Sequence, residues 1–273
     1  MSEQPIWRLM ITPPAPGAWN MAVDEAIAAH AGRGDVPSTL RFYQWQPACV
    51  SLGRHQPLAD IDLDRCAALG YDVVRRPTGG RAILHTDELT YSVAGPQYDP
   101  ALAGAVLDSY LRLSQGLLAG LERLGLRVAK APPTNRAPAD AGPVCFEVPS
   151  AYEIVAGGRK LVGSAQSRRK GWVLQHGTLP LTGDITRLVD TLALADEAER
   201  SRLRVDLTDR ATTVEAVLGR PVGFAEAAAA VRAGFGEALG IRFEEGELSA
   251  QESDAARQLE REVYAAGEWN GKF

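Results

Sequence analysis

The sequence predicts an α+β fold in which mixed or antiparallel sheets are packed with helices. Short apolar runs typical of strands lie mostly in the first two thirds of the 273 residues, and helical patterns gather in the last third. The order of these runs is not the strict alternation that builds a parallel sheet. No internal repeat or linker divides the chain. We therefore expect a single domain over residues 1–273, with a core at about residues 35–245 and a C-terminal helical tail.

The first half of the chain contains most of the expected strands. Asn20 is a suitable N-cap for the first helix, and Gly70 and Gly125 follow the next two. The helices are expected at Met21–Ala31, Asp60–Leu69 and Asp108–Leu124. The strands are expected at Ile6–Ile11, Thr39–Tyr43, Ala48–Leu52, Tyr71–Arg75, Ala82–Leu84, Glu88–Val93 and Leu126–Val128.

The second half begins with a long loop and a hairpin and then becomes helical. Residues 131–142 are rich in Pro and Ala and have no periodicity, which is typical of a surface loop. Gly157 and Gly158 supply the positive φ of a tight turn. The strands of that hairpin are expected at Ala151–Val155 and Lys160–Gly163, and a last strand is expected at Ile241–Glu244. The helices are expected at Thr186–Leu192, Asp196–Leu207 (or a loop), Thr212–Leu218, Phe224–Leu239 and Ser253–Tyr264.

Composition and charge exclude several classes of protein. The chain is 45% hydrophobic and 23% charged, as in ordinary globular enzymes, and its net charge of −5 argues against a nucleic-acid binder. The N-terminus lacks the pattern of a signal peptide, and no apolar run approaches the length of a membrane span. Three cysteines do not form a disulfide framework, so we expect a reducing, cytoplasmic location and no membrane partner.

A glycine pair between two strands is the first candidate for a ligand site. Residues 75–85 read RRPTGGRAILH, which places Gly79 and Gly80 among Arg75, Arg76 and Arg81. Adjacent glycines let backbone N–H groups approach a ligand, and such a turn suits an anion. The alternative is a plain hairpin turn with exposed arginines. The pattern GxxxxGK[ST] is absent, which excludes a nucleotide P-loop.

The second candidate is the stretch from Pro143 to Leu179. It contains Cys145 after the long loop, Lys160 fifteen residues later, and His176. The thiolate is the reactive form of cysteine, so a nucleophilic cysteine needs a positive neighbour, which Lys160 can provide. Cys145 lies between Val144 and Phe146, so a small buried hydrophobe is the alternative. For Cys49 and Cys66, in apolar runs, burial is the expected state.

These motifs together resemble a known superfamily. The stretch RRPTGGRAILH, the run KLVGSAQ from Lys160 and the run QHGT from Gln175 are similar to lipoate and octanoate transferases and ligases, which share the catalytic fold of biotin protein ligases. The stretches NMAVDEAI, LRFYQWQPACVSLGRHQ and YAAGEWN agree, so the similarity covers nearly the whole chain. The resemblance is to the octanoyl-acyl-carrier-protein:protein N-octanoyltransferases that use a cysteine thioester, and it implies one catalytic domain.

The resemblance implies a role for each residue of the site. Octanoyl would pass from octanoyl-acyl carrier protein to Cys145, and then to the lysine of a lipoyl-domain acceptor such as the glycine-cleavage H protein. Lys160 would activate the cysteine, and no metal or cofactor is expected. The residues expected to bind substrate are Arg76, Gly79, Gly80, His85, Gly163, Ser164, His176 and Gly177.

The donors for the oxyanion and the wall of an acyl tunnel are expected in the same strands. The backbone around Gly163–Ala165 and the rings of His85 and His176 are candidate donors, although both histidines can also be structural. Gln44 and Gln56 lie near strand ends, where they would form either a pocket rim or solvated turns. By strand alternation, the apolar wall would consist of Val73, Ala82, Leu84, Leu161 and Val162.

Three other functions remain open at this point. An ATP-dependent lipoate ligase shares the glycine, lysine and HG motifs, and in it Lys160 would contact an acyl-adenylate phosphate. An amidotransferase that moves octanoyl or lipoyl groups between carrier proteins also uses a cysteine. In an inactive scaffold or a cofactor-binding module, Cys145 would have no chemical role.

Overall fold

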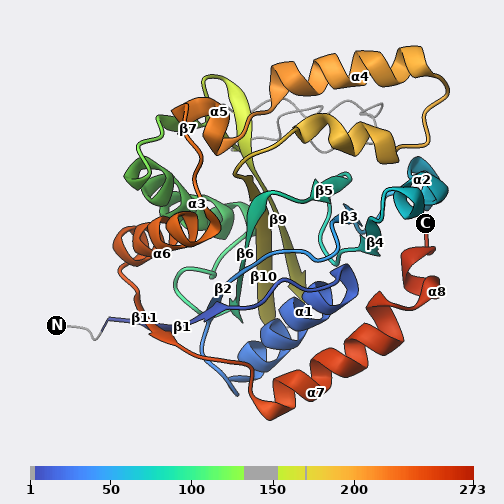
Figure 1. Ribbon diagram of the computed structural model, residues 1–273. Helices are drawn as coiled ribbons and strands as arrows, with labels where there is room; N and C mark the ends of the chain where they lie inside the picture. Colours follow the sequence, from blue (N-terminus) through green and yellow to red (C-terminus); the bar gives the residue numbers. More distant parts are fainter. Residues whose placement is uncertain (1–3, 132–152, 170) are drawn as a thin grey trace.

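The computed structural model describes residues 4–131, 153–169 and 171–273. Within these residues two sheets form the centre of the molecule (Figure 1). The larger sheet has the strand order β11-β1-β2-β6-β10-β9-β8-β7, and the smaller has the order β4-β3-β5. The strands of the larger sheet are β1 (Ile6–Ile11), β2 (Thr39–Tyr43), β6 (Glu88–Pro96), β7 (Val128–Lys130), β8 (Ile154–Ala156), β9 (Arg159–Arg169), β10 (Trp172–Pro180) and β11 (Arg242–Glu245).

The larger sheet is mixed, as predicted. Strand β1 runs parallel to β11 and β2, whereas β2, β6, β10, β9, β8 and β7 pair in antiparallel fashion. In the smaller sheet, β3 (Cys49–Leu52) is parallel to β4 (Asp72–Arg75) and antiparallel to β5 (Ile83–His85). The α+β prediction of mixed sheets packed with helices is confirmed.

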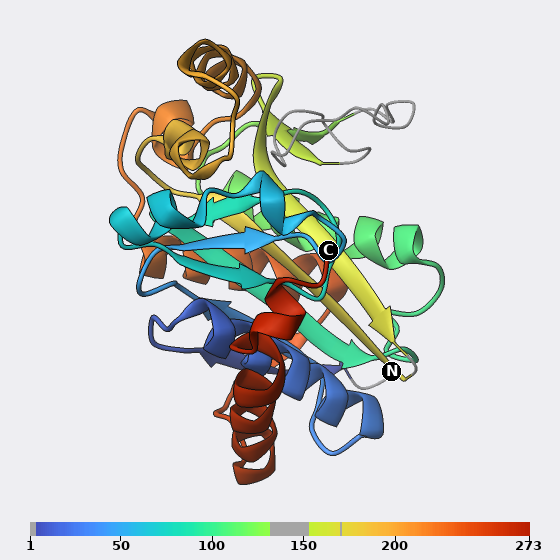
Figure 2. The ribbon, with the colours of Figure 1, turned by 90° about the vertical axis from the view of Figure 1, so that its right-hand side faces the viewer.

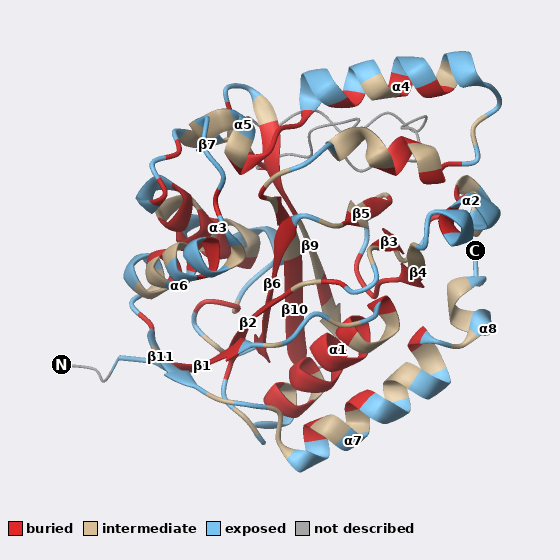
Figure 3. Cartoon of the chain, in the orientation of Figure 1, coloured by how far each residue is buried: buried red, intermediate tan, exposed pale blue. Residues whose placement is uncertain are grey.

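Helices cover both faces of the larger sheet because side chains alternate along its strands. Leu9 and Phe42 pack with α3 (Val106–Arg123) and α6 (Phe224–Leu239) on one face. The neighbouring Met10 and Tyr43 pack with α1 (Gly17–Arg33) and α7 (Ala250–Leu259) on the other. Figure 3 shows α1 as the most deeply buried of these helices, since α7 covers its outer side.

Helices α3 and α6 approach each other closely because glycines face each other. A Cβ atom on Gly234 would lie 2.1 Å from the backbone nitrogen of Gly120, and one on Gly120 would lie 2.6 Å from the Cα of Val231. Any side chain at these positions would force the helices apart. The boundaries predicted for α6 are confirmed, and those predicted for α3 are within two residues of the observed ones.

Of the remaining helices, α5 (Val214–Leu218) packs against the same core as α3 and α6, and the others lie near the smaller sheet and the C-terminal end. Figure 2 shows the C-terminal segment passing in front of the sheets. The other short helices are α2 (Leu63–Ala68) and α8 (Gly267–Asn270); α4 spans Glu197–Arg210, and Leu58–Asp60 and Ile185–Thr191 are 3₁₀ turns. Among the described residues, none of the helices has the length and apolar character needed to cross a bilayer.

Several predicted boundaries are wrong for identifiable reasons. Helix α1 begins at Gly17 and not after Asn20, whose side-chain amide instead donates to the carbonyls of Ala15 and Gln44 at 3.0 and 3.1 Å. The helix predicted at Asp60–Leu69 is a 3₁₀ turn followed by α2, because Asp62 caps α2. Strand β10 was not predicted. The turn prediction for Gly157 and Gly158 is confirmed, since their φ values are positive, at 57° and 79°.

Candidate active site

A cavity of about 180 Å³ lies between the two sheets. All eight residues that the sequence assigned to substrate binding border it. Five of its nine other lining residues are apolar or aromatic and four are polar, and they come from both sheets and α1. The lining residues are Met21, Tyr43, Trp45, Ser51, Arg76, Gly79, Gly80, Ile83, His85, Thr90, Glu153, Gly163, Ser164, Ala165, His176, Gly177 and Thr178.

The guanidinium of Arg76 holds the glycine loop at the cavity. Its Nη1 donates to the carbonyl of Ser51 at 2.8 Å, and its Nη2 donates to the carbonyls of Gly79 and Arg81 at 2.7 and 2.9 Å. Gly80 has a φ of +96°, and a Cβ there would lie 2.7 Å from Nη2 of Arg76. The loop therefore requires glycine at position 80 for its backbone conformation, and the predicted approach of a ligand to the glycine pair stays a prediction.

Arg75 does not belong to this site, contrary to the prediction of a ring of three arginines around the loop. Its side chain is fully buried and donates to the carbonyls of Gly53, Gln56 and Asn270 at 2.9, 2.6 and 2.8 Å. Successive residues of a strand point to opposite faces, so Arg75 and Arg76 cannot both face the cavity. Arg75 instead fastens the C-terminal segment to β4.

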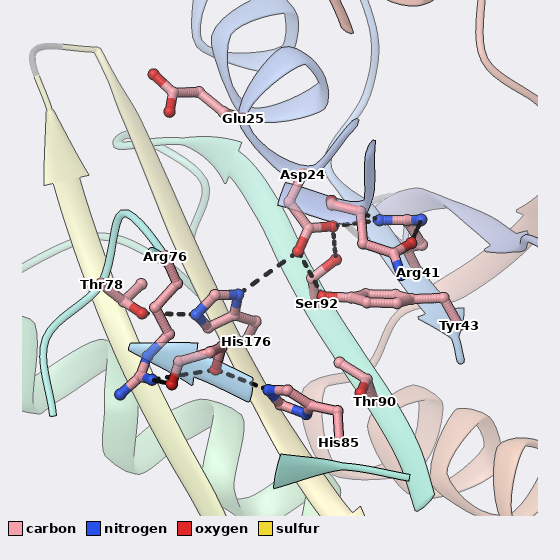
Figure 4. Close-up of polar contacts among 12 residues, drawn as sticks. Asp24, Glu25, Arg41, Tyr43, Arg76, Thr78, His85, Thr90, Ser92 and His176 are labelled. Carbon is pink, nitrogen blue, oxygen red and sulfur yellow. Dashed lines mark hydrogen bonds and ion pairs between the residues drawn. The ribbon is translucent and has the colours of Figure 1, made fainter. Parts of the chain in front are cut away.

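His176 links the glycine loop to a buried carboxylate (Figure 4). Its Nε2 lies 2.6 Å from Oγ1 of Thr78, and its Nδ1 lies 3.5 Å from Oδ2 of Asp24. Burial lowers the pKa of His176 despite the nearby Asp24 carboxylate, so the ring is neutral at pH 7.

Asp24 is held by four donors from the sheet and from His176. Burial alone would raise its pKa, but the Arg41 guanidinium at 2.7 Å and the bonds from His176 and Ser92 outweigh that effect and lower it. The hydroxyl of Tyr43 also donates to Asp24, at 2.8 Å. The carboxylate therefore stays charged and fixes the imidazole.

His85 is fixed in a similar way on the other sheet. Its Nδ1 lies 2.7 Å from Oε1 of Glu88, its Nε2 lies 2.8 Å from Oγ of Ser51, and its ring stacks on Trp45 with 4.1 Å between centroids. Burial raises the pKa of Glu88, but His85 and the hydroxyls of Thr178 and Thr90 together lower it. The rings of His85 and His176 therefore each have partners at both nitrogens.

Lys160 and Glu153 form a buried ion pair beside the cavity. The Nζ of Lys160 donates to Oε1 of Glu153, and the two side chains are 2% and 3% exposed. A Cβ on Gly163 would lie 3.6 Å from that Nζ, so the ammonium lies directly behind Gly163. Glu153 borders the cavity, whereas Lys160 does not.

Ser164 and Gly177 shape the wall formed by β9 and β10. The Ser164 hydroxyl lies 2.7 Å from that of Tyr91, which also accepts from Gln175 at 3.0 Å. A Cβ on Gly177 would lie 2.5 Å from the carbonyl oxygen of Gly163, so only glycine fits there. The two residues thus set the local shape of the wall.

The predicted apolar wall is wrong. None of Val73, Ala82, Leu84, Leu161 and Val162 borders the cavity. Ile83 does, which shows that the assumed alternation in β5 was shifted by one residue. Gln44 and Gln56 do not form the rim either: Gln56 is buried and its amide donates to Asp60 at 3.0 Å.

Two further outcomes concern cysteine and a missed acid. Cys49 and Cys66 are buried, as predicted, whereas Cys145 lies outside the described residues.

Glu153 was not among the residues predicted from the sequence, because a single acid beside a strand is usually exposed to solvent. The signal that was available is its position seven residues before Lys160, on the other side of a glycine turn.

Comparison with known proteins identifies the family. The lipoyl protein ligase A/B catalytic domain matches residues 16–236, which is most of the chain. The chain belongs to this family. It is 45% identical over 270 residues to octanoyltransferase LipM of Symbiobacterium thermophilum, with 97% of each chain covered. It is 43% identical to octanoyltransferase LipM of Kyrpidia tusciae, with 97% of this chain and 98% of that one covered.

Solved structures share the fold. A bipartite lipoate protein ligase described with its E2 lipoyl domain, from Thermoplasma acidophilum, superposes with a TM-score of 0.83 at 26% identity, covering 98% of both chains. A lipoate-protein ligase A bound with ATP gives 0.80 at 27% identity, covering 97% of this chain and 99% of that one. These relatives confirm the predicted superfamily and fold, and the octanoyltransferases among them confirm the predicted enzyme class.

Proposed function

We propose that residues 1–273 form one catalytic domain that transfers octanoyl from octanoyl-acyl carrier protein, through a thioester on Cys145, to the lysine of a lipoyl-domain protein such as the glycine-cleavage H protein. The observation that carries the proposal is the convergence of the eight predicted substrate-binding residues and the Lys160–Glu153 pair around one cavity. The similarity to octanoyltransferases supports the acyl group, and the ligase described with its E2 lipoyl domain supports the acceptor class.

The proposed reaction has two acyl transfers. The Cys145 thiolate attacks the donor carbonyl, the carbon–sulfur bond to the carrier breaks, and the carrier sulfur leaves and becomes a thiol by taking up a proton. The acceptor amine then attacks the new thioester, and the Cys145 sulfur leaves with the bonding electrons. Dividing the transfer into two steps replaces one high barrier by two lower ones.

The other two cysteines are poor candidates for the nucleophile. Burial raises the pKa of the Cys49 thiol well above its usual value and that of Cys66 to about 11. Because the thiolate is the reactive form, both remain protonated near neutral pH. This supports Cys145 as the reactive cysteine, with Lys160 as the positive neighbour that the resemblance implies.

The cavity has the surface character that an acyl chain needs. Met21, Trp45 and Ile83 supply apolar walls, while Arg76 and the glycine loop lie where a polar head group would be. Burying seven methylene or methyl groups at about 0.8 kcal/mol each would contribute at most roughly 5–6 kcal/mol to donor binding.

An ATP-dependent ligase is the second candidate, because an ATP-bound ligase shares the fold. The two functions differ in the source of activation: a thioester is already activated, whereas a free acid needs a nucleotide. We expect octanoylation of an apo lipoyl-domain protein from octanoyl-acyl carrier protein without ATP, and no modification from free octanoate or lipoate with ATP and Mg²⁺. Mass analysis of the acceptor distinguishes the two, and modification with the ATP mixture alone would establish the ligase.

A further inference from the structure

Strand β4 has an edge that side chains from the C-terminal segment cover. Among the described strands, β4 lies at the end of the smaller sheet, with β3 on one side. Such an edge presents backbone N–H and C=O groups that need partners. At Arg75, the last residue of β4, the N–H donates to Oδ1 of Asn270 at 2.8 Å, and the carbonyl accepts from Nε1 of Trp269 at 2.9 Å. Two side chains of α8, which lies beside β4 in Figure 1, thus take the place of a neighbouring strand.

The side chain of Arg75 returns these contacts. Its Nη2 donates to the backbone carbonyl of Asn270 at 2.8 Å, and its Nε donates to the carbonyls of Trp269 and Asn270, each at 3.2 Å. The last carbonyls of a helix have no partner within the helix, so the guanidinium supplies donors that α8 lacks. The Asn270 amide also donates to the carbonyl of Tyr264 at 2.9 Å, which fixes its orientation. Arg75 and the two residues of α8 therefore hold each other through both backbone and side chain.

One route from Arg75 to the glycine loop follows the chain. The next residue, Arg76, borders the cavity, and its guanidinium holds the loop. The carbonyl of Arg75 and the N–H of Arg76 belong to one planar peptide unit. Trp269 binds that carbonyl, and the N–H donates to the carbonyl of Leu52 at 3.0 Å. The peptide unit is thus held on both sides, which sets the direction in which the Arg76 side chain leaves the strand.

The other route passes through the turn that follows β3. Nη1 of Arg75 donates to the carbonyl of Gly53 at 2.9 Å. A Cβ atom on Gly53 would lie 1.8 Å from the carbonyl oxygen of Gly80, so the backbones of the turn and the glycine loop are in direct contact. The N–H of Arg54 also donates to the carbonyl of Thr78 at 2.8 Å. The turn that Arg75 holds therefore supports the glycine loop.

We propose that Trp269 and Asn270 are positioning residues for the glycine loop. They hold Arg75, which in turn holds the peptide unit of Arg76 and the turn that contacts Gly80. The loop then keeps the conformation in which it borders the cavity. The consequence for the reaction rests on the proposed function, in which the loop receives the acyl donor. The order of the loop itself does not depend on that function.

Amide hydrogen exchange measures the order of the loop without any substrate. Asn270→Ala removes the partner of the Arg75 N–H, and Trp269→Phe removes the partner of its carbonyl but keeps an aromatic ring. Loss of such a partner typically weakens local stability enough to raise exchange by about 5- to 100-fold. We expect this increase at the N–H groups of Arg54 and Arg76 in both variants. Asn270→Asp, which keeps an oxygen for the Arg75 N–H, should exchange more slowly than Asn270→Ala.

Steady-state kinetics connects the loop to the donor. If only a fraction of the variant has an ordered loop, its apparent affinity for the donor falls by that fraction, and saturating donor restores the ordered state. We therefore expect the KM for octanoyl-acyl carrier protein to rise by about 10-fold in Asn270→Ala, while kcat changes by less than about 2-fold. A simple loss of folded enzyme would instead lower kcat and leave KM unchanged.

The matched control is Glu252→Gln. Glu252 belongs to α7 in the same C-terminal segment, is buried, and pairs with Arg8 of β1 in the larger sheet at 2.5 Å. Its replacement should lower the melting temperature. It should leave hydrogen exchange in the glycine loop and the KM for the donor unchanged.

Two results would overturn the proposal. One is wild-type exchange at Arg54 and Arg76 in folded Asn270→Ala and Trp269→Phe, which would make α8 only a cover for β4. The other is an equal increase in Glu252→Gln, which would indicate a general loosening of the C-terminal segment. Faster exchange with an unchanged KM for the donor would support the positioning of the loop and contradict the proposed place of the donor head group.

Discussion

His85, His176 and Glu153 border the same cavity, but the two histidines and the Lys160–Glu153 pair differ in the partners that hold them. His85 and His176 are held at both ring nitrogens by carboxylates and hydroxyls. Glu153 borders the cavity and accepts a hydrogen bond from the Lys160 ammonium. The histidines therefore link the glycine loop and the two sheets, and the ion pair places a buried cation and anion beside the cavity. Residues of conspicuous motifs can thus have structural partners, while an acid with no motif borders the cavity.

Removal of Lys160 should have the largest effect. Lys160→Ala removes the positive charge that is proposed to activate Cys145 and removes the ammonium from its ion pair with Glu153, so we expect transfer to fall by at least about 10²-fold. Alkylation of Cys145 by iodoacetamide near neutral pH should slow as well. Leaving a buried charge unpaired costs about 3–5 kcal/mol, so melting curves must accompany the rates.

Lys160→Arg is the control for that loss of stability. It keeps a cation beside Glu153, so the fold should survive, while its bulk and fixed fork change the position of the charge. If Lys160→Ala is folded and alkylates Cys145 at the wild-type rate, Lys160 has only a structural or substrate-binding role.

Removal of His176 should have a smaller effect. It should change the stability of the fold and the way in which that stability depends on pH. Burial lowers the pKa of His176 in the folded state, whereas in the unfolded chain this histidine has an ordinary pKa near 6.5. Below about pH 6.5 the unfolded chain therefore binds more protons than the folded protein. Stability should therefore fall as the pH drops below about 6.5, with a slope from this group of at most about 1.4 kcal/mol per pH unit.

Thermal unfolding between pH 5 and pH 8 measures this slope. His176→Gln should be less stable at pH 7, because Thr78 and Asp24 lose a partner, and it should show a shallower decline toward pH 5. A decline as steep as that of the wild type would assign the pH dependence to other groups and would contradict the neutral state of the His176 ring.

The sequence predicted the fold well where a local pattern decides the structure. Helix α6 ends at Gly240, which adopts the left-handed conformation, and the hairpin at Gly157 and Gly158 follows from their positive φ values. The position of Gly80 in a loop at the cavity was likewise predictable. These features depend on backbone conformations that few residues other than glycine adopt.

The sequence could not predict features that depend on contacts between distant segments. Asn20 looks like a helix cap, but it lies inside α1, and its side-chain amide donates to the carbonyl of the distant Gln44. Arg75 and Arg76 are adjacent and alike in sequence, yet one binds the C-terminal segment and the other the glycine loop. The place of Glu153 at the cavity, paired with Lys160, likewise depends on how the strands assemble.

The central claim is that the acyl group passes through a cysteine thioester, and intact-mass analysis tests it most directly. Wild-type enzyme mixed with octanoyl-acyl carrier protein, without ATP, should gain one octanoyl group that hydroxylamine removes. Cys145→Ala should gain none and should fail to modify the acceptor, since Cys49 and Cys66 are buried and protonated. An octanoyl adduct that persists in Cys145→Ala would contradict the account.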